Sequence, residues 1–310
     1  LEYPIAIAAA GALCIASSGV LVRLASASPV TVAFYRCLYA LPVLLAITAF
    51  EKRRLGALPQ RDVKLAWVAG VFFATDLIFW HNAIDAVGAG LATVLGNLQV
   101  LIVGFAAWAI LGERPRNTLF VAIPVMIVGV VLISGVVGAG AYGEDPALGV
   151  VFGIATSIAY AAFILTLREG SRDLRRVAGP LFHATLISAI ATAIYGAVVG
   201  GMDWDPGWPA HGWLLVLALT SQVLGWLLIS LSLPRLPAAI TSAVLLLQPV
   251  GALALAAVVV DEHPSVAQLA GAGLIVVGVV VATSSHRREP AVERLTSVAT
   301  TGPALAPPPE

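Results

Sequence analysis

Long apolar stretches govern what this chain can fold into. Ten of them, each of about 20 residues, follow one another along the sequence and are separated by short polar segments. A helix of about 20 apolar residues crosses the hydrocarbon core of a bilayer, which is about 30 Å thick. Only 11% of the residues are charged, whereas soluble domains carry about 25%. We therefore predict an all-α integral membrane protein with ten transmembrane helices at 4–22, 30–50, 65–84, 88–111, 117–137, 147–167, 177–199, 212–231, 238–260 and 265–284.

Basic residues are distributed unequally among the segments that connect these stretches. If the N-terminus is cytoplasmic, fifteen of the 17 Lys and Arg residues fall on the cytoplasmic side. The exceptions are Arg23, at the outer end of the first stretch, and Arg36, within the second. Because basic residues accumulate in cytoplasmic loops, this pattern predicts that both termini are cytoplasmic. Residues 286–310 are polar and Pro-rich, which is typical of a disordered tail.

The second half of the chain repeats part of the first. A shift of 149 residues places Gln99 on Gln248, Glu113 on Glu262, and the "VGVV" at 128–131 on the "VGVV" at 277–280. We therefore predict two repeats, 1–138 and 147–285, each with five helices around a central cavity. Five is an odd number, so the second repeat must enter the membrane inverted. Inverted repeats are typical of secondary transporters, which bind substrate near the midplane, where the halves meet.

The motifs in these repeats resemble those of the drug/metabolite transporter superfamily, specifically its ten-helix EamA-type members. The resemblance rests on "LGERP" at 111–115 with its second copy "VDEHP" at 260–264, on "VGVVLIS" and "VGVVVAT", and on "FYRCLYA" at 34–40. It implies a basket-shaped bundle around a central cavity. Among these families the chain looks most like bacterial exporters of aromatic and other amino acids, which implies a multi-pass protein of the inner membrane.

The "LGERP" motif itself is interpreted as a turn. Gly112 can end one helix and Pro115 suits the first turn of the next, whose positive end lies close to Glu113. Its second copy has neither of the flanking arginines, because it lies on the other side of the membrane. The motif therefore marks topology rather than a substrate site.

Two charges within the predicted helices are candidates for the transport pathway. Arg36 and Asp76 lie at similar depth in the outer half of the membrane, so an ion pair between them is geometrically feasible. Either they form such a structural contact or they bind substrate or protons. On the third helix, Trp80 lies one turn beyond Asp76, and Gln222 and Trp226 repeat this polar-then-Trp spacing on the eighth. These aromatic and polar pairs suit an amphipathic solute, although packing against neighbouring helices would explain them too.

Amide side chains supply the other candidates. Asn97 and Gln99 are two positions apart, about 200° around a helix, so we expect only one of them to face the cavity. The repeat favours Gln99, which corresponds to Gln248, whereas Asn97 aligns with Thr93 one turn earlier and is suited to a hydrogen bond across to a neighbouring helix. His81 and Tyr160 complete the set of candidate pathway residues.

These patterns predict a secondary transporter that exports amino acids of broad range by alternating access and facilitated diffusion. The alternative is a proton-coupled exporter of a drug, a nucleotide-sugar or another small metabolite. The sequence has no P-loop pattern and no His/Glu metal pattern, so we expect no ATP motor, no metal and no cofactor. An enzyme is not expected, because essentially one membrane acid is available. The expected partners are an amino acid-like small molecule and the lipid bilayer, not nucleic acid, and the oligomeric state stays open, a monomer included.

Overall fold

The computed structural model describes residues 3–111, 117–137, 140–171, 173, 175–232, 244 and 246–283. Every regular element in these residues is a helix. Most of the "LGERP" motif, the start of the ninth expected stretch and the tail at 286–310 lie outside the described residues. The helices are α1 (Pro4–Ala16), α2 (Ser18–Ala25), α3 (Pro29–Leu55), α4 (Gln60–Val87), α5 (Ala89–Gly96), α6 (Gln99–Leu111), α7 (Asn117–Ile133), α8 (Pro146–Glu169), α9 (Ala178–Val199), α10 (Ala210–Leu217), η1 (Ala218–Gly225), α11 (Trp226–Ser232), α13 (Leu247–Val259) and α14 (Val266–Thr283).

Among the described residues, eight helical segments are long and apolar enough to cross a membrane. Two shorter apolar helices, α7 and α13, occupy the fifth and ninth expected stretches. The predicted membrane-spanning character of the chain is therefore confirmed.

Three of the expected helices depart from regular α-helix geometry in the structure. Ser17 separates α1 from α2, and its hydroxyl donates to the Cys14 carbonyl at 2.8 Å in competition with the helix ladder. A turn at Asn97 and Leu98 separates α5 from α6, and the eighth expected helix contains the π-helix η1. Irregular backbone at membrane depth is tolerated where protein or a cavity surrounds it. These breaks therefore point to the interior of the bundle as the place of function.

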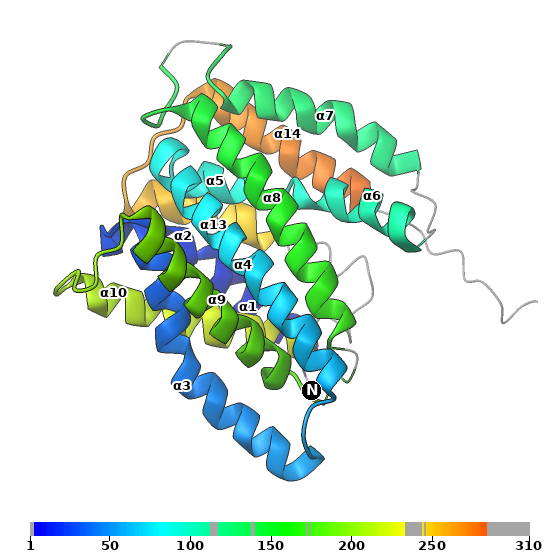
Figure 1. Cartoon of the computed structure of the whole chain (residues 1–310). Coiled ribbons are helices and arrows are strands. Elements are labelled where there is room, and N and C mark those ends of the chain that lie inside the picture. The colour runs from blue at the N-terminus through cyan, green and yellow to red at the C-terminus, as the bar shows by residue number, and fades with distance from the viewer. Residues whose placement is uncertain are drawn as a thin grey trace, which may run out of the picture.

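The two predicted halves, 1–138 and 147–285, interlock through many helix contacts. α4 lies along α8 and α9, α3 lies along α9, and α7 lies beside α14 (Figure 1). Several contacts have a counterpart when the halves are exchanged. α4 packs against α8, and the corresponding elements of the other half, η1 and α11, pack against α1. Likewise, α5 packs against α8, and the corresponding helix α13 packs against α1. The interior of the bundle is therefore built from both halves.

The contact between α7 and α14 depends on two glycines. A Cβ atom at Gly271 would lie 2.5 Å from the Gly129 carbonyl oxygen, and one at Gly129 would lie 2.7 Å from the Gly271 carbonyl oxygen. No real Cβ atom approaches a carbonyl this closely, so only glycine allows this backbone separation. Small residues of this kind are a common basis of helix association in membranes.

Glu262 connects the halves at the end where α5 begins. The residue is 1% exposed, and its carboxylate accepts hydrogen bonds from the backbone N–H groups of Ala89, at 2.6 Å, and Gly90, at 3.1 Å. The first N–H groups of a helix have no partner within the helix, and a carboxylate both satisfies them and complements the positive end of the helix dipole. The second copy of the repeated turn thus fixes the first turn of a helix in the other half, in addition to reversing the chain.

We predict that Gly271→Leu lowers the free energy of unfolding by about 1–3 kcal/mol, because α7 and α14 must move apart. The matched control is Gly273→Leu in the same helix, where a Cβ atom meets nothing within 4 Å. Thermal unfolding in detergent, followed by tryptophan fluorescence, measures both. Equal melting temperatures for the two variants would contradict the close contact.

We predict that Glu262→Gln costs about 1.5–3 kcal/mol of stability, because a charged acceptor for two backbone N–H groups is lost. Faster hydrogen exchange at Ala89 and Gly90, measured by mass spectrometry, should accompany the lower melting temperature. Glu144→Gln serves as the control, because Glu144 is an exposed residue of the loop before α8. A similar effect in both variants would show that the cap contributes nothing.

Candidate functional site

A cavity lies inside the bundle, where the breaks in the helices meet. Its volume is about 90 Å³, the size of a few water molecules. Both halves contribute to its wall. The lining residues are Ile15, Ser18, Arg36, Phe73, Asp76, Leu77, Trp80, Thr93, Gly96, Asn97, Gln99, Thr156, Tyr160, Trp226 and Gln248.

Arg36 supplies the positive charge of the cavity. It lies on α3, is 4% exposed, and donates from Nη2 to the Oε1 atom of Gln222 at 3.3 Å. Gln222 in turn donates from Nε2 to the hydroxyl oxygen of Thr185 at 3.2 Å, which fixes the orientation of the amide. The Nε atom of Arg36 is buried and has no hydrogen-bond partner among the described residues. The guanidinium carbon lies 5.8 Å from the centre of the Trp80 ring, within the range of a cation–π interaction.

Asp76 supplies the negative charge. It is 7% exposed, and the Thr156 hydroxyl lies within hydrogen-bond distance of both its backbone carbonyl, at 3.1 Å, and its carboxylate. The ion pair with Arg36 that the sequence allowed is not formed: among the described residues, the hydrogen-bond partner of each charge is a neutral side chain. The cavity therefore holds two opposite charges that do not neutralise each other by direct contact.

Amides from corresponding positions of the two halves face the same cavity. Gln99 and Gln248 both line it, as the repeat predicts. The expectation that Asn97 and Gln99 could not both do so is wrong, because the helix is interrupted between them. At this break the N–H groups of Asn97 and Leu98 bond to carbonyls three residues back rather than four, which changes the direction of the following side chains. The Asn97 side chain donates to the Thr93 carbonyl in its own helix at 2.8 Å rather than to a neighbouring helix.

Aromatic rings form the apolar part of the wall. Trp80, Trp226, Tyr160 and Phe73 line the cavity. The ring of Trp226 packs edge-on against Tyr160, with centroids 6.3 Å apart, and against Phe163, with centroids 5.4 Å apart. Since Trp226 follows directly after η1, the wider π-helical turn sets the direction in which this ring points.

Two of the sequence candidates lie behind the wall. Gln222 is fully buried and supports Arg36, and His81 is fully buried beside Trp80, with ring centroids 5.3 Å apart. Sequence reasoning missed Thr156 and Thr185, which provide the neutral partners of Asp76 and Gln222. Threonine is common in apolar helices, and neither position carries a signal beyond a hydroxyl within a predicted span.

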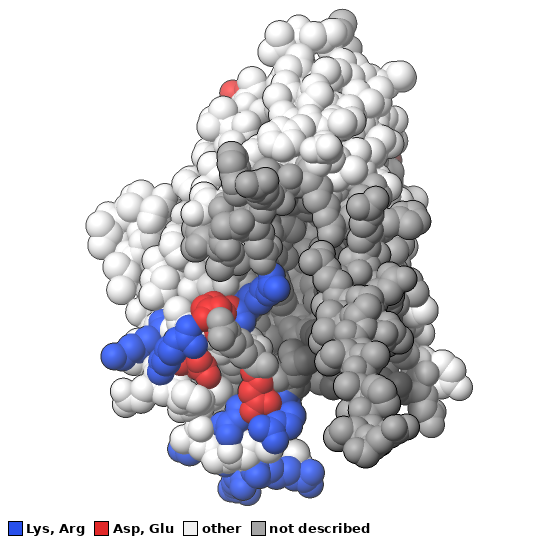
Figure 2. Space-filling view, turned by 90° about the vertical axis from the view of Figure 1, so that its right-hand side faces the viewer, with Lys and Arg blue, Asp and Glu red and all other residues white. Residues whose placement is uncertain are grey.

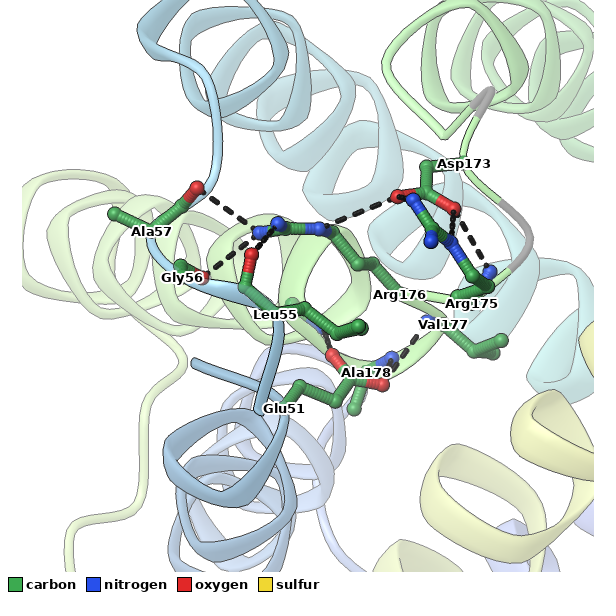
Figure 3. A network of polar contacts seen from close by, with 10 residues as sticks. Glu51, Leu55, Gly56, Ala57, Asp173, Arg175, Arg176, Val177 and Ala178 are labelled. Atoms are coloured by element: carbon green, nitrogen blue, oxygen red, sulfur yellow. Dashed lines mark hydrogen bonds and ion pairs between the residues drawn. The ribbon is translucent and has the colours of Figure 1, made fainter. Parts of the chain in front are cut away.

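A second polar cluster lies at the end of the molecule where α3 ends and α9 begins (Figure 3). The Glu51 carboxylate accepts from the N–H groups of Val177, Ala178 and Gly179 at 2.9–3.0 Å and so caps α9. In return, the Arg176 guanidinium donates to the last carbonyls of α3 and the loop after it, those of Leu55, Gly56 and Ala57. Thus α3 supplies the charged cap of α9, and the loop that leads into α9 supplies the charged cap of α3.

Asp173 completes this cluster. It forms ion pairs with Arg175, at 2.9 Å, and with Arg176, at 3.3 Å. Hydrogen bonds from the side chain and the backbone N–H of Arg175 lower the pKa of the Asp173 carboxyl to about 2. The carboxylate therefore remains ionised at neutral pH and continues to orient Arg176. On the face drawn in Figure 2, the Lys and Arg side chains gather at this end of the molecule.

No group of three or more His, Cys, Asp or Glu side chains within the described ranges could hold a metal ion. The chemistry available in the cavity is therefore that of one guanidinium, one carboxylate, several amides and hydroxyls, and aromatic rings. Such a set is suited to binding a small amphipathic solute.

Comparison with known proteins agrees with this description. The model of the EamA-like transporter family matches residues 3–135 and again residues 147–284. No curated protein matches the chain, whereas 25 chains of solved structures do. One of these, a crystal structure of a protein, shares the fold with a TM-score of 0.60 and 18% identity, over 91% of this chain and 96% of that one. Since the family model covers most of the sequence in two copies, the chain belongs to the EamA-like transporter family, within the drug/metabolite transporter superfamily, and is a multi-pass membrane transporter of small molecules.

Proposed function

We propose that this transporter exports amino acids, aromatic and other, across the bacterial inner membrane by alternating access. One observation carries the proposal: the cavity contains one guanidinium and one carboxylate that are not paired with each other, beside aromatic rings. A zwitterion with an apolar side chain has the complementary set of groups.

Both charged side chains have hydrogen-bonding groups that no described residue uses, which supports this assignment. Arg36 donates to a described residue only from Nη2, so a carboxylate of the substrate can accept from the rest of the guanidinium without displacing Gln222. Of the two carboxylate oxygens of Asp76, only Oδ1 has a partner among the described residues, which leaves Oδ2 for a substrate ammonium group. Trp80, Trp226 and Tyr160 would then contact the substrate side chain.

Charge and size argue against the other substrate classes. A phosphorylated substrate such as a nucleotide-sugar needs several cations, and Arg36 is the only Lys or Arg among the described residues of the cavity wall. The volume of about 90 Å³ is well below the range of about 300–1,000 Å³ that is typical of sites for drug-sized ligands. A small metabolite without net charge fits both observations, and an amino acid as large as Phe requires the cavity to widen as the halves move.

The arrangement of the halves supports alternating access. The cavity draws residues from both halves, Gln99 and Gln248 occupy corresponding positions in its wall, and the interrupted helices meet there. These are the features by which inverted-repeat transporters place their site at the midplane. We propose that the two halves are inverted, that the end carrying Glu51, Arg175 and Arg176 faces the cytoplasm, and that both termini lie on that side.

Facilitated diffusion is the proposed mode, because the sequence contains no P-loop and the described part of the cavity wall has a single acid. One observation favours proton coupling as the second candidate: Asp76 is buried and makes no ion pair with a described residue. Protonation of such a carboxylate would change the charge of the cavity.

The substrate class is tested with purified protein in proteoliposomes. We expect counterflow of labelled Phe, Met and Thr that is insensitive to a pH gradient, and weaker flux of Lys and Glu, whose additional charge finds no partner in the wall. If none of the five amino acids is transported, the amino acid proposal is wrong.

We predict that Arg36→Gln lowers the affinity for Phe by about 10- to 100-fold, because a charge-assisted hydrogen bond contributes about 1.5–3 kcal/mol. Phenethylamine, which lacks the carboxylate, should bind both forms equally. Isothermal titration calorimetry measures these affinities, with the exposed Arg53→Gln on the same helix as the control. An equal loss for both ligands would show that Arg36 stabilises the bundle rather than binding a carboxylate.

Asp76→Asn separates the two modes of transport. With facilitated diffusion, the variant binds Phe more weakly and remains insensitive to a pH gradient, because only the partner of the ammonium group is lost. With proton coupling, the wild type responds to the gradient and the variant exchanges Phe without responding to it. Transport assays at inward and outward gradients of about one pH unit distinguish these outcomes, since one unit corresponds to about 1.4 kcal/mol per proton.

A further inference from the structure

A second cavity lies beneath the polar cluster that joins α3 to α9. Its volume is about 180 Å³, roughly six times the share of a water molecule in the liquid. The polar part of its wall includes Thr48, Glu51 and Lys52 from α3, together with Arg176 just before α9 and His183 in the first turns of that helix. This cavity is separate from the transport site, since no described residue lines both.

Two charged side chains in its wall, Glu51 and Arg176, already have partners. The Glu51 carboxylate accepts three backbone N–H groups at the positive end of α9, which compensate its negative charge. The Arg176 guanidinium donates to three carbonyls and pairs with Asp173. These groups build the wall and keep its shape.

Three further groups have no such partners. The Thr48 hydroxyl oxygen and the His183 Nδ1 atom are buried without a hydrogen-bond partner among the described residues. Threonines elsewhere in the helices, among them Thr75, Thr93 and Thr192, donate to the carbonyl four residues back, whereas Thr48 does not. Lys52 is exposed at the rim of the cavity and forms no ion pair with a described residue.

A hydroxyl, an imidazole and an ammonium group in the wall of one cavity are suited to the oxygens of a phosphate group. Each can donate a hydrogen bond, and the ammonium adds a positive charge. A buried polar group without a hydrogen-bond partner destabilises the folded protein. A bound phosphate would therefore supply the acceptors that Thr48 and His183 lack. Arg53 and Arg54 follow Lys52 in the last turn of α3 and raise the local positive potential.

The surroundings favour a phosphate that is carried by a lipid. α3 has 27 residues, which corresponds to about 40 Å, so its last turn extends beyond a hydrocarbon core of about 30 Å to the level of the headgroups. Leu45 shares the side of α3 that carries Thr48 and Lys52, and it is 52% exposed. Acyl chains can lie along this apolar surface while the headgroup reaches the cavity.

We propose that this cavity binds the phosphate group of an anionic phospholipid from the adjacent leaflet, through Lys52, Thr48 and His183. The shared chemistry is a phosphate oxyanion, which a soluble phosphate ester could also supply. Phosphatidylglycerol and glycerol 3-phosphate are therefore the two probes.

The test uses the full chain in detergent, with binding of phosphatidylglycerol and phosphatidylcholine followed by native mass spectrometry. We expect retained phosphatidylglycerol and little phosphatidylcholine. Lys52→Gln and Thr48→Val should each weaken phosphatidylglycerol binding by about tenfold, the loss expected for a hydrogen bond to a charged group. Arg53→Gln is the matched control: it removes the same charge from the neighbouring residue, which does not line the cavity.

Glycerol 3-phosphate is the second arm. If this soluble ester competes at concentrations comparable with those of the lipid, the cavity is a phosphate site, but its ligand is a soluble ester rather than a phospholipid. Equal losses in Lys52→Gln and Arg53→Gln would overturn the proposal in favour of general surface attraction, as would equal binding of both lipids. Melting temperatures without lipid check that the variants fold, and Arg36→Gln should bind phosphatidylglycerol normally, so the outcome is independent of the transport assays.

Discussion

The backbone groups at the ends of the helices need hydrogen-bond partners, and the rest of this structure depends on how those partners are supplied. The first N–H groups and the last C=O groups of a helix lack partners within it, and inside a membrane protein water cannot always supply them. Here charged side chains from the other half of the chain do so: Glu262 for α5, Glu51 for α9 and Arg176 for α3. Each contact completes a helix and ties the two halves together. The capped helices include those that carry Arg36, Thr93 and Thr185, so the caps also hold the cavity in shape.

Much of the fold is encoded in features that can be read locally. Apolar stretches of spanning length form helices, and the motifs repeated at 149 residues lie in the two segments that match the family model. The spacing of Asp76 and Trp80 alone predicts that they share a face, and both line the cavity. Such predictions succeed because helix periodicity fixes the direction of a side chain.

Other features depend on contacts that no local pattern reveals. The partner of Asp76 is Thr156, 80 residues away, and the choice between that hydroxyl and Arg36 is made by tertiary packing. The interruption at Asn97 did have a signal, the Gly96–Asn97 dipeptide, which is typical of a helix end. Reading the segment as one continuous helix produced the wrong orientation of Asn97. The π-helix before Trp226 has no comparable signature.

The cap on α5 links opening of the protein to the entry of water. Glu262 lies between α13 and α14, whereas the N–H groups that it accepts belong to α5 in the other half. Any movement that separates these elements leaves a carboxylate and two amide groups without partners at the same moment. They can be stabilised only by solvent, so hydration and separation must proceed together at this end of the molecule. The rate of that step would then depend on how readily water and dissolved ions reach the first turn of α5.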